Sequence, residues 1–132
     1  MNSHIIYQPE RMDFDMPMHM DIIEESEEPL VLSFVGGAEH GNVNGVTHGG
    51  VLFYLCDEIV GRYVTRLGRS GAAAEGSIHF YRPALLGKKI LISISERKSG
   101  KRLGTYLVEL RYEDGTLVAD ALFTVAFGDG SR

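Results

Sequence analysis

The sequence feature that most constrains the fold is an abrupt change of pattern at the run His48-Gly49-Gly50. After this run, apolar residues recur at the three- and four-residue spacing of an amphipathic helix rather than the alternation of a strand. Thr47 is a suitable N-cap and Gly68 a suitable stop, so we predict one helix over about residues 48 to 66. Its predicted buried face consists of Val51, Leu52, Leu55, Cys56, Ile59, Val60, Tyr63 and Val64.

Two glycines in a first helical turn call for an explanation, because each costs roughly 1 kcal/mol relative to alanine. One explanation is that another group approaches the backbone closely. The free N–H groups of a first turn lie at the positive end of the helix dipole, where they can hold a carbonyl oxygen that gains negative charge during attack. Gly49 is the best candidate donor. The alternative is that Gly49 and Gly50 only let the helix end pack against a strand, and glycines alone favour that alternative.

Two adjacent carboxylates on the predicted helix have different surroundings. Glu58 has Arg62 four residues later, which is the spacing of an ordinary surface ion pair. Asp57 falls on a mostly apolar face without a cation, so we predict that it is partly desolvated and suited to act as general base or nucleophile. The alternative is a solvated aspartate or one that is hydrogen-bonded to a neighbouring strand.

The separation of Gly49 and Asp57 limits how they can cooperate. Eight residues of α-helix at about 1.5 Å per residue span roughly 12 Å, which is too far for both groups to act on one carbonyl. If both serve one reaction, a second chain must bring its Asp57 to the first chain's Gly49. The sequence therefore predicts two equivalent sites across a twofold axis.

Apolar-rich runs bounded by turn residues flank the helix. The predicted strands are 19–25, 30–35, 72–82, 87–97, 103–113 and 116–127, with turns at 27–29, 86–87, 99–100 and 114–115. This order predicts an α+β fold, with an antiparallel sheet wrapped around one long central helix. Within the third strand, Ala74, Gly76, Ile78 and Phe80 are expected to face the helix.

The charge distribution is uneven along the chain, whose net charge is −5. Residues 1–40 carry a net charge of −8, and the acidic run in 21–28 is expected to form a solvated hairpin edge. The basic residues after the helix fall near strand ends, where they could meet the phosphates of coenzyme A or simply solubilise loops. They are Lys88, Lys89, Arg97, Lys98, Lys101 and Arg102. No aromatic residue is interleaved among them, which disfavours nucleic-acid binding.

The remaining composition restricts the chemistry and the compartment. Cys56 is the only cysteine and lies among apolar residues, so we expect a buried structural thiol, no intrachain disulfide and no metal cluster. None of the histidines shows a ligand pattern, and no metal site is predicted. The chain shows no secretory leader and no stretch of membrane-spanning length, so we expect a cytoplasmic protein with no membrane association.

Several motifs together resemble one known family. The resemblance rests on Asn42, Gly45, His48, Gly49, Gly50 and Asp57, on the segment 78–84 that ends in Arg82-Pro83-Ala84, and on the segments 100–103 and 114–119. This pattern is similar to the PaaI-like acyl-CoA thioesterases of the hotdog fold and covers roughly residues 20 to 127. It implies one hotdog domain over 1–132, with a Met-rich leader at 1–18, the core at 19–127 and a tail at 128–132.

The resemblance implies an acyl-CoA thioesterase that hydrolyses an acyl- or aryl-CoA to free acid and coenzyme A. The Gly49 N–H would polarise the thioester carbonyl, and Asp57 of the partner subunit would act as general base or nucleophile. Asn42 and His48 would help to hold the thioester or the attacking water. At Ala73 the family often carries a serine or threonine that helps to position water. The expected substrate-binding residues are Gly50, Phe53, Tyr54, Ala73, Arg82, Lys101 and Arg102.

No cofactor is implied, because coenzyme A is part of the substrate. The expected assembly is a homodimer at least, with a homotetramer also possible. Two functions are left open: a thioesterase, and a binding module that holds an acyl-thioester without cleaving it, which the alanine at position 73 permits. The retained carboxylate of Asp57 favours catalysis. The sequence does not select the acyl group, and it does not distinguish coenzyme A from an acyl carrier protein.

Overall fold

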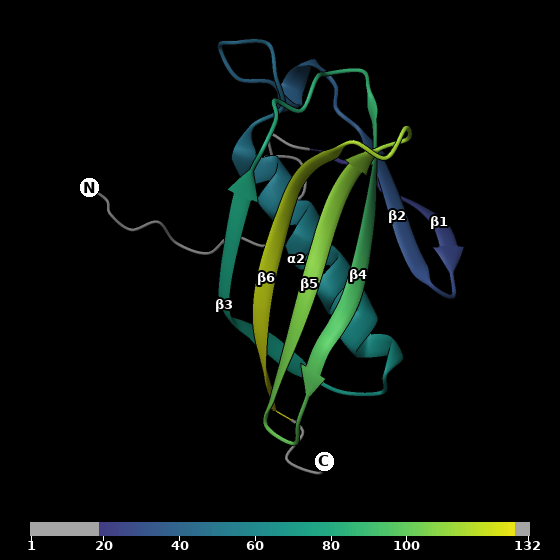
Figure 1. Ribbon diagram of the computed structural model, residues 1–132, viewed down its shortest axis with the longest axis vertical. Coiled ribbons are helices and arrows are strands. Elements are labelled where there is room, and N and C mark those ends of the chain that lie inside the picture. The colour runs from purple at the N-terminus through teal and green to yellow at the C-terminus, as the bar shows by residue number, and fades with distance from the viewer. Residues whose placement is uncertain (1–18, 129–132) are drawn as a thin grey trace, which may run out of the picture.

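The computed structural model describes residues 19–128, which form one antiparallel sheet crossed by one long helix (Figure 1). The strand order is β1-β2-β4-β5-β6-β3, and the predicted α+β architecture is confirmed. The elements are β1 (Ile23–Glu27), β2 (Leu30–Val35), the 3-10 helix η1 (Ala38–His40), α2 (Gly49–Arg66), β3 (Gly71–Phe80), β4 (Lys89–Ser99), β5 (Leu103–Tyr112) and β6 (Leu117–Phe127).

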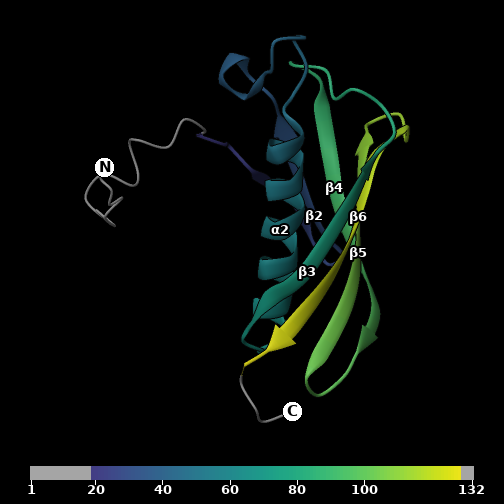
Figure 2. The same cartoon turned by 90° about the vertical axis from the view of Figure 1, so that its left-hand side faces the viewer.

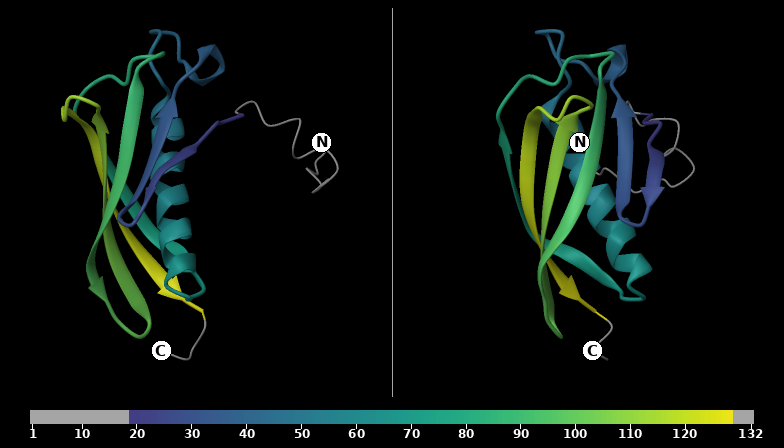
Figure 3. Two further views of the ribbon diagram at one scale, coloured as in Figure 1. Left: turned by 90° about the vertical axis from the view of Figure 1, so that its right-hand side faces the viewer. Right: turned by 45° about the vertical axis from the view of Figure 1, so that its right-hand side comes forward.

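The core lies between α2 and the sheet, which curves around the helix (Figures 2 and 3). All the predicted core residues of α2 are buried except Tyr63, which is half-buried. The sheet contributes alternate residues, as in β5, where Tyr106, Val108 and Leu110 are buried between exposed or half-buried neighbours. Amphipathic periodicity in the helix and alternation in the strands therefore produce a single shared core.

The start of α2 corrects one prediction. The helix begins at Gly49, so His48 occupies the N-cap position, and its side chain makes no capping hydrogen bond. Thr47 is not the N-cap, because it forms an isolated bridge with Gly41 and is buried. The bridge between Thr47 and the preceding loop therefore outweighs the preference of threonine for the N-cap position.

The predicted strands recur within two residues of β2, β3, β4, β5 and β6. The first is displaced: the prediction was 19–25, whereas β1 spans Ile23–Glu27. Residues 19–22 lie outside the sheet, and the His19 carbonyl oxygen is paired with the His40 ring. β1 lies at the sheet edge as predicted, where Glu24 forms an ion pair with Arg66.

A bulge in β3 overturns part of the predicted alternation. The register with β6 shifts between Ala73 and Glu75, and Ala73 pairs with the buried Val125. Ala73 therefore faces the helix, and Ala74 is the additional residue of the bulge, contrary to the prediction. Gly76 and Phe80 face the helix as predicted, since a Cβ atom at Gly76 would lie 3.0 Å from the Phe53 ring.

The predicted leader 1–18 and nearly all of the tail 128–132 lie outside the described residues. In the part of the chain that the structure describes, no helix is long and apolar enough to cross a membrane.

Candidate active site

The start of α2 is held in place by the loop that follows β2. The ring of His40 is buried, and its Nδ1 accepts a hydrogen bond from the Gly37 N–H at 2.8 Å, which identifies Nε2 as the protonated nitrogen facing the His19 carbonyl. The His40 carbonyl oxygen accepts the N–H of His48 at 2.8 Å. Phe34 packs on the ring edge-on at 5.0 Å. His40 therefore fixes the residue that immediately precedes the helix.

Asn42 organises the tip of the same loop. Its Oδ1 accepts hydrogen bonds from the N–H groups of Asn44 (2.8 Å) and Val46 (3.3 Å). Beyond the tip, the Thr47 N–H donates to the Ala84 carbonyl at 2.8 Å, which ties the loop to the connection between β3 and β4. Because Oδ1 serves the loop, the Nδ2 amide is the part of Asn42 left for a ligand.

Two backbone donors are free at the helix start. The His48 carbonyl accepts the N–H groups of Val51 at 3.0 Å and Leu52 at 3.3 Å, as in the first turn of any helix. Within residues 19–128, the N–H groups of Gly49 and Gly50 form no hydrogen bond. They therefore remain available to an acceptor at the positive end of the helix dipole.

Gly49 opens into a cavity of about 390 Å³ between the helix start and the segment after β3. Its walls include Phe80, Tyr81 and Arg82. Phe80 is 52% exposed and lies so close to Gly49 that a Cβ atom there would come within 3.0 Å of its ring. Arg82 is exposed and has no ion-pair partner in the described chain. The structure thus brings Gly49 and Arg82 to one cavity, with a backbone donor at one wall and a cation at another.

Asp57 lies in a different cavity, of about 750 Å³, with Gly71, Ala72, Ala73 and Val125. The structure therefore joins Asp57 and Ala73, but it does not bring Asp57 to Gly49 in one chain. Asp57 is also exposed, contrary to the predicted partial desolvation. The apolar face predicted around Asp57 consists of neighbouring helix residues whose side chains are buried in the core. The side chain of Asp57 itself faces solvent.

The two acidic neighbours differ as predicted. Glu58 accepts a hydrogen bond from Arg62 Nε at 2.7 Å in a confirmed i,i+4 ion pair. Cys56 is fully buried, as predicted. Burial, reinforced by the charges of Asp120 and Asp57, raises the pKa of Cys56 to about 12.

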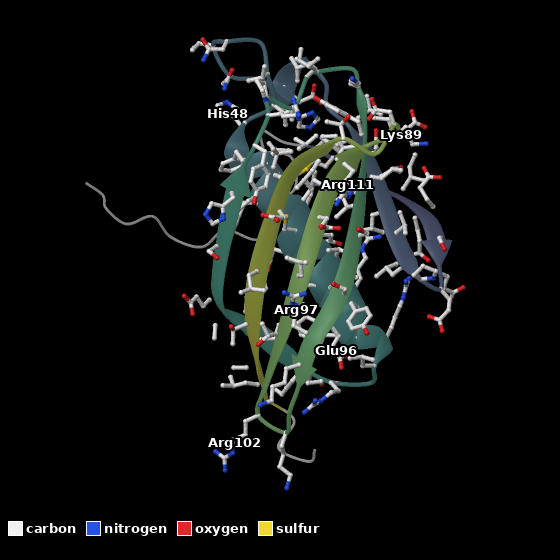
Figure 4. The ribbon with its side chains drawn as sticks, in the orientation of Figure 1. His48, Lys89, Glu96, Arg97, Arg102 and Arg111 are labelled. Atoms are coloured by element: carbon white, nitrogen blue, oxygen red, sulfur yellow. The ribbon has the colours of Figure 1, made fainter. Side chains whose placement is uncertain are left out.

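Other predicted binding residues lie away from both cavities. Phe53 packs on Phe123 with ring centroids 5.2 Å apart, so it fills the core. Tyr54 is 44% exposed on the outer surface of α2. Lys101 and Arg102 belong to the turn between β4 and β5, at the opposite end of the molecule from His48 (Figure 4). Within one chain they therefore lie far from the helix start at Gly49.

Sequence reasoning gave no site role to Phe80 or His40, which shape the helix start in the structure. The alternation of β3 indicated that Phe80 faces the helix, and that was the available signal. No local pattern marked His40, because its partners at Gly37 and His19 depend on how the loop folds back.

The chain has clear relatives among known proteins. Residues 44–119 match the family described as the Thioesterase superfamily. A putative esterase of Archaeoglobus fulgidus is 32% identical over 79% of this chain and 68% of its own length. The acyl-coenzyme A thioesterase PaaI of Escherichia coli is 27% identical over 89% of this chain and 83% of its own. The solved PaaI structure matches at a TM-score of 0.76, with 27% identity over 84% of this chain and 80% of that chain.

A hypothetical thioesterase protein of Streptococcus pneumoniae, solved with coenzyme A, matches at a TM-score of 0.73, with 28% identity over 83% of this chain and 96% of its own. Mutants of it with an aspartate or a threonine replaced by alanine, at positions 16 residues apart, have also been solved. The matched residues include the Gly49 helix start and Asp57. The chain therefore belongs to the thioesterase superfamily, as a PaaI-like member with the hotdog fold.

Proposed function

We propose that the protein hydrolyses an acyl- or aryl-CoA thioester to the free acid and coenzyme A, with each active site built from two chains. Gly49 of one chain polarises the thioester carbonyl, and Asp57 of the partner acts as general base on water or as nucleophile. The observation that carries the proposal is the free Gly49 N–H at the helix start, facing a cavity whose other wall carries Arg82.

The chemistry follows from these groups. In the general-base route, Asp57 takes a proton from water, the water oxygen attacks the carbonyl carbon, and the oxyanion forms at the Gly49 N–H. Collapse of the intermediate breaks the C–S bond, and the thiolate leaves as coenzyme A and takes up a proton. Asn42 offers its Nδ2, and His48 its exposed ring, to the thioester or the water. Arg82, at the wall of the Gly49 cavity, supplies a cation for a coenzyme A phosphate.

A second chain is required by distance. Gly49 and Asp57 both belong to the continuous helix α2, eight residues apart, and this separates them by about 12 Å. Their two cavities are distinct in one chain. A partner that covers Asp57 would also remove water from this exposed carboxylate, which supplies the predicted desolvation. A homodimer is thus the smallest assembly that completes the site.

Ala73 favours a second candidate, a module that binds an acyl-thioester without cleaving it. The cavity of Asp57 presents only a methyl group at this position. In the Streptococcus pneumoniae protein, the two mutated positions, an aspartate and a threonine, have the same separation as Asp57 and Ala73. The chain therefore retains the acid but carries no hydroxyl at position 73. The retained acid favours hydrolysis, because a binder gains nothing from a carboxylate next to a thioester.

The test is thiol release from a panel of acyl-CoAs, short and long aliphatic together with phenylacetyl and hydroxybenzoyl, by wild type and Asp57→Asn. We expect release by wild type and a loss of at least a hundredfold in the variant, with ligand binding retained in both. Turnover that survives Asp57→Asn would remove the assigned role of Asp57. If no acyl-CoA of the panel releases thiol and binding is still detectable, the binding module would be established instead.

A further inference from the structure

The hydroxyl group of Tyr112 holds the connection between β3 and β4. Tyr112 is the last residue of β5, and it is 5% exposed and belongs to the core between the sheet and α2. Its O–H donates to the carbonyl oxygen of Pro83 at 2.9 Å, and the same oxygen accepts the N–H of Leu85 at 3.0 Å. One phenolic oxygen therefore binds two backbone groups of a segment that belongs to no named helix or strand.

The same connection lies beside the loop that precedes α2 (Figures 1 and 3). The Ala84 carbonyl accepts the N–H of Thr47 at 2.8 Å, and Val46 forms an isolated bridge with Leu85. Thr47 lies only two residues before the helix start at Gly49. The segment that Tyr112 holds is thus the one against which the helix start is fixed.

The connection also carries the cation of the Gly49 cavity. Arg82, Pro83 and Ala84 line this cavity, whereas Tyr112 does not. The Arg82 side chain is exposed, and no acidic side chain of residues 19–128 pairs with it. The position of its guanidinium group therefore depends on the backbone that carries it, and the residue that follows is the one whose carbonyl Tyr112 holds.

We propose that Tyr112 is a positioning residue for coenzyme A, because its hydroxyl fixes the backbone next to Arg82 and thereby directs the guanidinium toward a phosphate. This inference rests on the proposed function, in which Arg82 binds that phosphate, and it goes beyond that function by assigning a buried residue outside the cavity. Loss of the hydroxyl leaves the Pro83 carbonyl and the Leu85 N–H without this partner. The connection then has further conformations, and the affinity falls with the fraction of molecules in which Arg82 meets the phosphate.

The test is the dissociation constant of coenzyme A, measured by isothermal titration calorimetry. Tyr112→Phe removes the hydroxyl but keeps the ring, whose centroid lies 3.9 Å from the Lys88 ammonium. The matched control is Tyr106→Phe, because Tyr106 is the other core tyrosine of β5 and packs on Tyr63 in the C-terminal part of α2. The stoichiometry of the titration reports the folded fraction, so the Kd is obtained even from a destabilised variant.

We expect the Kd of coenzyme A to rise about three- to tenfold in Tyr112→Phe, as for the loss of about one hydrogen bond, and at most about twofold in Tyr106→Phe. Arg82→Gln should raise it at least about tenfold. Addition of Tyr112→Phe to Arg82→Gln should then change the Kd by less than about twofold, because the hydroxyl acts through the guanidinium. A purely structural role of Tyr112 would instead give effects that multiply in the double variant.

Two results would overturn the proposal: a wild-type Kd in Tyr112→Phe, or single-variant effects that multiply in the double variant. The titration needs no turnover, so it is independent of thiol release. Non-additive weakening in a protein that releases no thiol would support the role of Tyr112 and refute hydrolysis. Multiplying effects in a protein that releases thiol would refute the role of Tyr112 alone.

Discussion

Replacing Gly49 by proline removes the proposed carbonyl donor with little change to the fold. Gly49 is the first residue of α2, where proline is tolerated because that N–H has no partner within the helix. The preceding residue, His48, has φ −56° and ψ 139°, within the region that a following proline allows. The control is Gly49→Ala, because both substitutions place a Cβ atom against Phe80 at 3.0 Å and alanine retains the N–H.

The expected difference between the two variants is the contribution of one backbone donor. Loss of one oxyanion-hole donor costs about 3–4 kcal/mol, so kcat of Gly49→Pro should fall about 100- to 1000-fold below that of Gly49→Ala. Steady-state kinetics on the best acyl-CoA measures kcat, and thermal denaturation verifies that both variants are folded. Equal kcat values in two folded variants would refute the role of the Gly49 N–H.

Three further predictions follow from the cavities and the core. Ala73→Thr adds a hydroxyl beside Asp57 and should raise kcat about three- to tenfold, as expected for one hydrogen bond; an unchanged or lower kcat would contradict this role. Arg82→Gln should raise KM for an acyl-CoA at least tenfold but leave KM for the phosphate-free N-acetylcysteamine thioester unchanged. Equal effects on both substrates would show that Arg82 does not bind phosphate. Between pH 8 and 10, wild type should lose about 1.4 kcal/mol more unfolding free energy than Cys56→Ala, as measured with urea. The reason is that the thiol ionises above pH 9 only when unfolded, since its folded pKa is about 12; equal losses would contradict this.

Much of the fold could be predicted because the patterns behind it are local. The helical spacing of Leu55, Cys56 and Ile59 requires one apolar face, and the same residues are buried against the sheet. Turn glycines at positions 87 and 115, both with positive φ, mark strand ends that alternation also indicates. Features that depend on tertiary pairing were not predicted, as with the bulge at Ala74, which appears only once β6 sets the register.

The residues of the candidate site also fall into those that a local sequence pattern indicates and those that depend on the tertiary structure. Gly49 could be selected as a candidate from the sequence because two glycines at a helix start are locally unfavourable, which calls for a close approach to the backbone by a ligand or by a neighbouring strand. The exposure of Asp57 could not be predicted, because it depends on how the fold places β3 and β6 around that helix position. Lys101 and Arg102 follow the helix in sequence, yet the length of β4 carries them to the far end of the sheet (Figure 4).

The central claim is that each site combines Gly49 of one chain with Asp57 of another, and subunit complementation tests it most directly. Gly49→Pro and Asp57→Asn would be co-expressed in equal amounts, and thiol release compared with wild type and with each variant alone. In random dimers half of the molecules are mixed, and each mixed dimer contains one site with both groups intact, so we predict about a quarter of wild-type activity. A co-expressed sample in which mixed dimers are present but which is no more active than the separate variants would contradict the shared site.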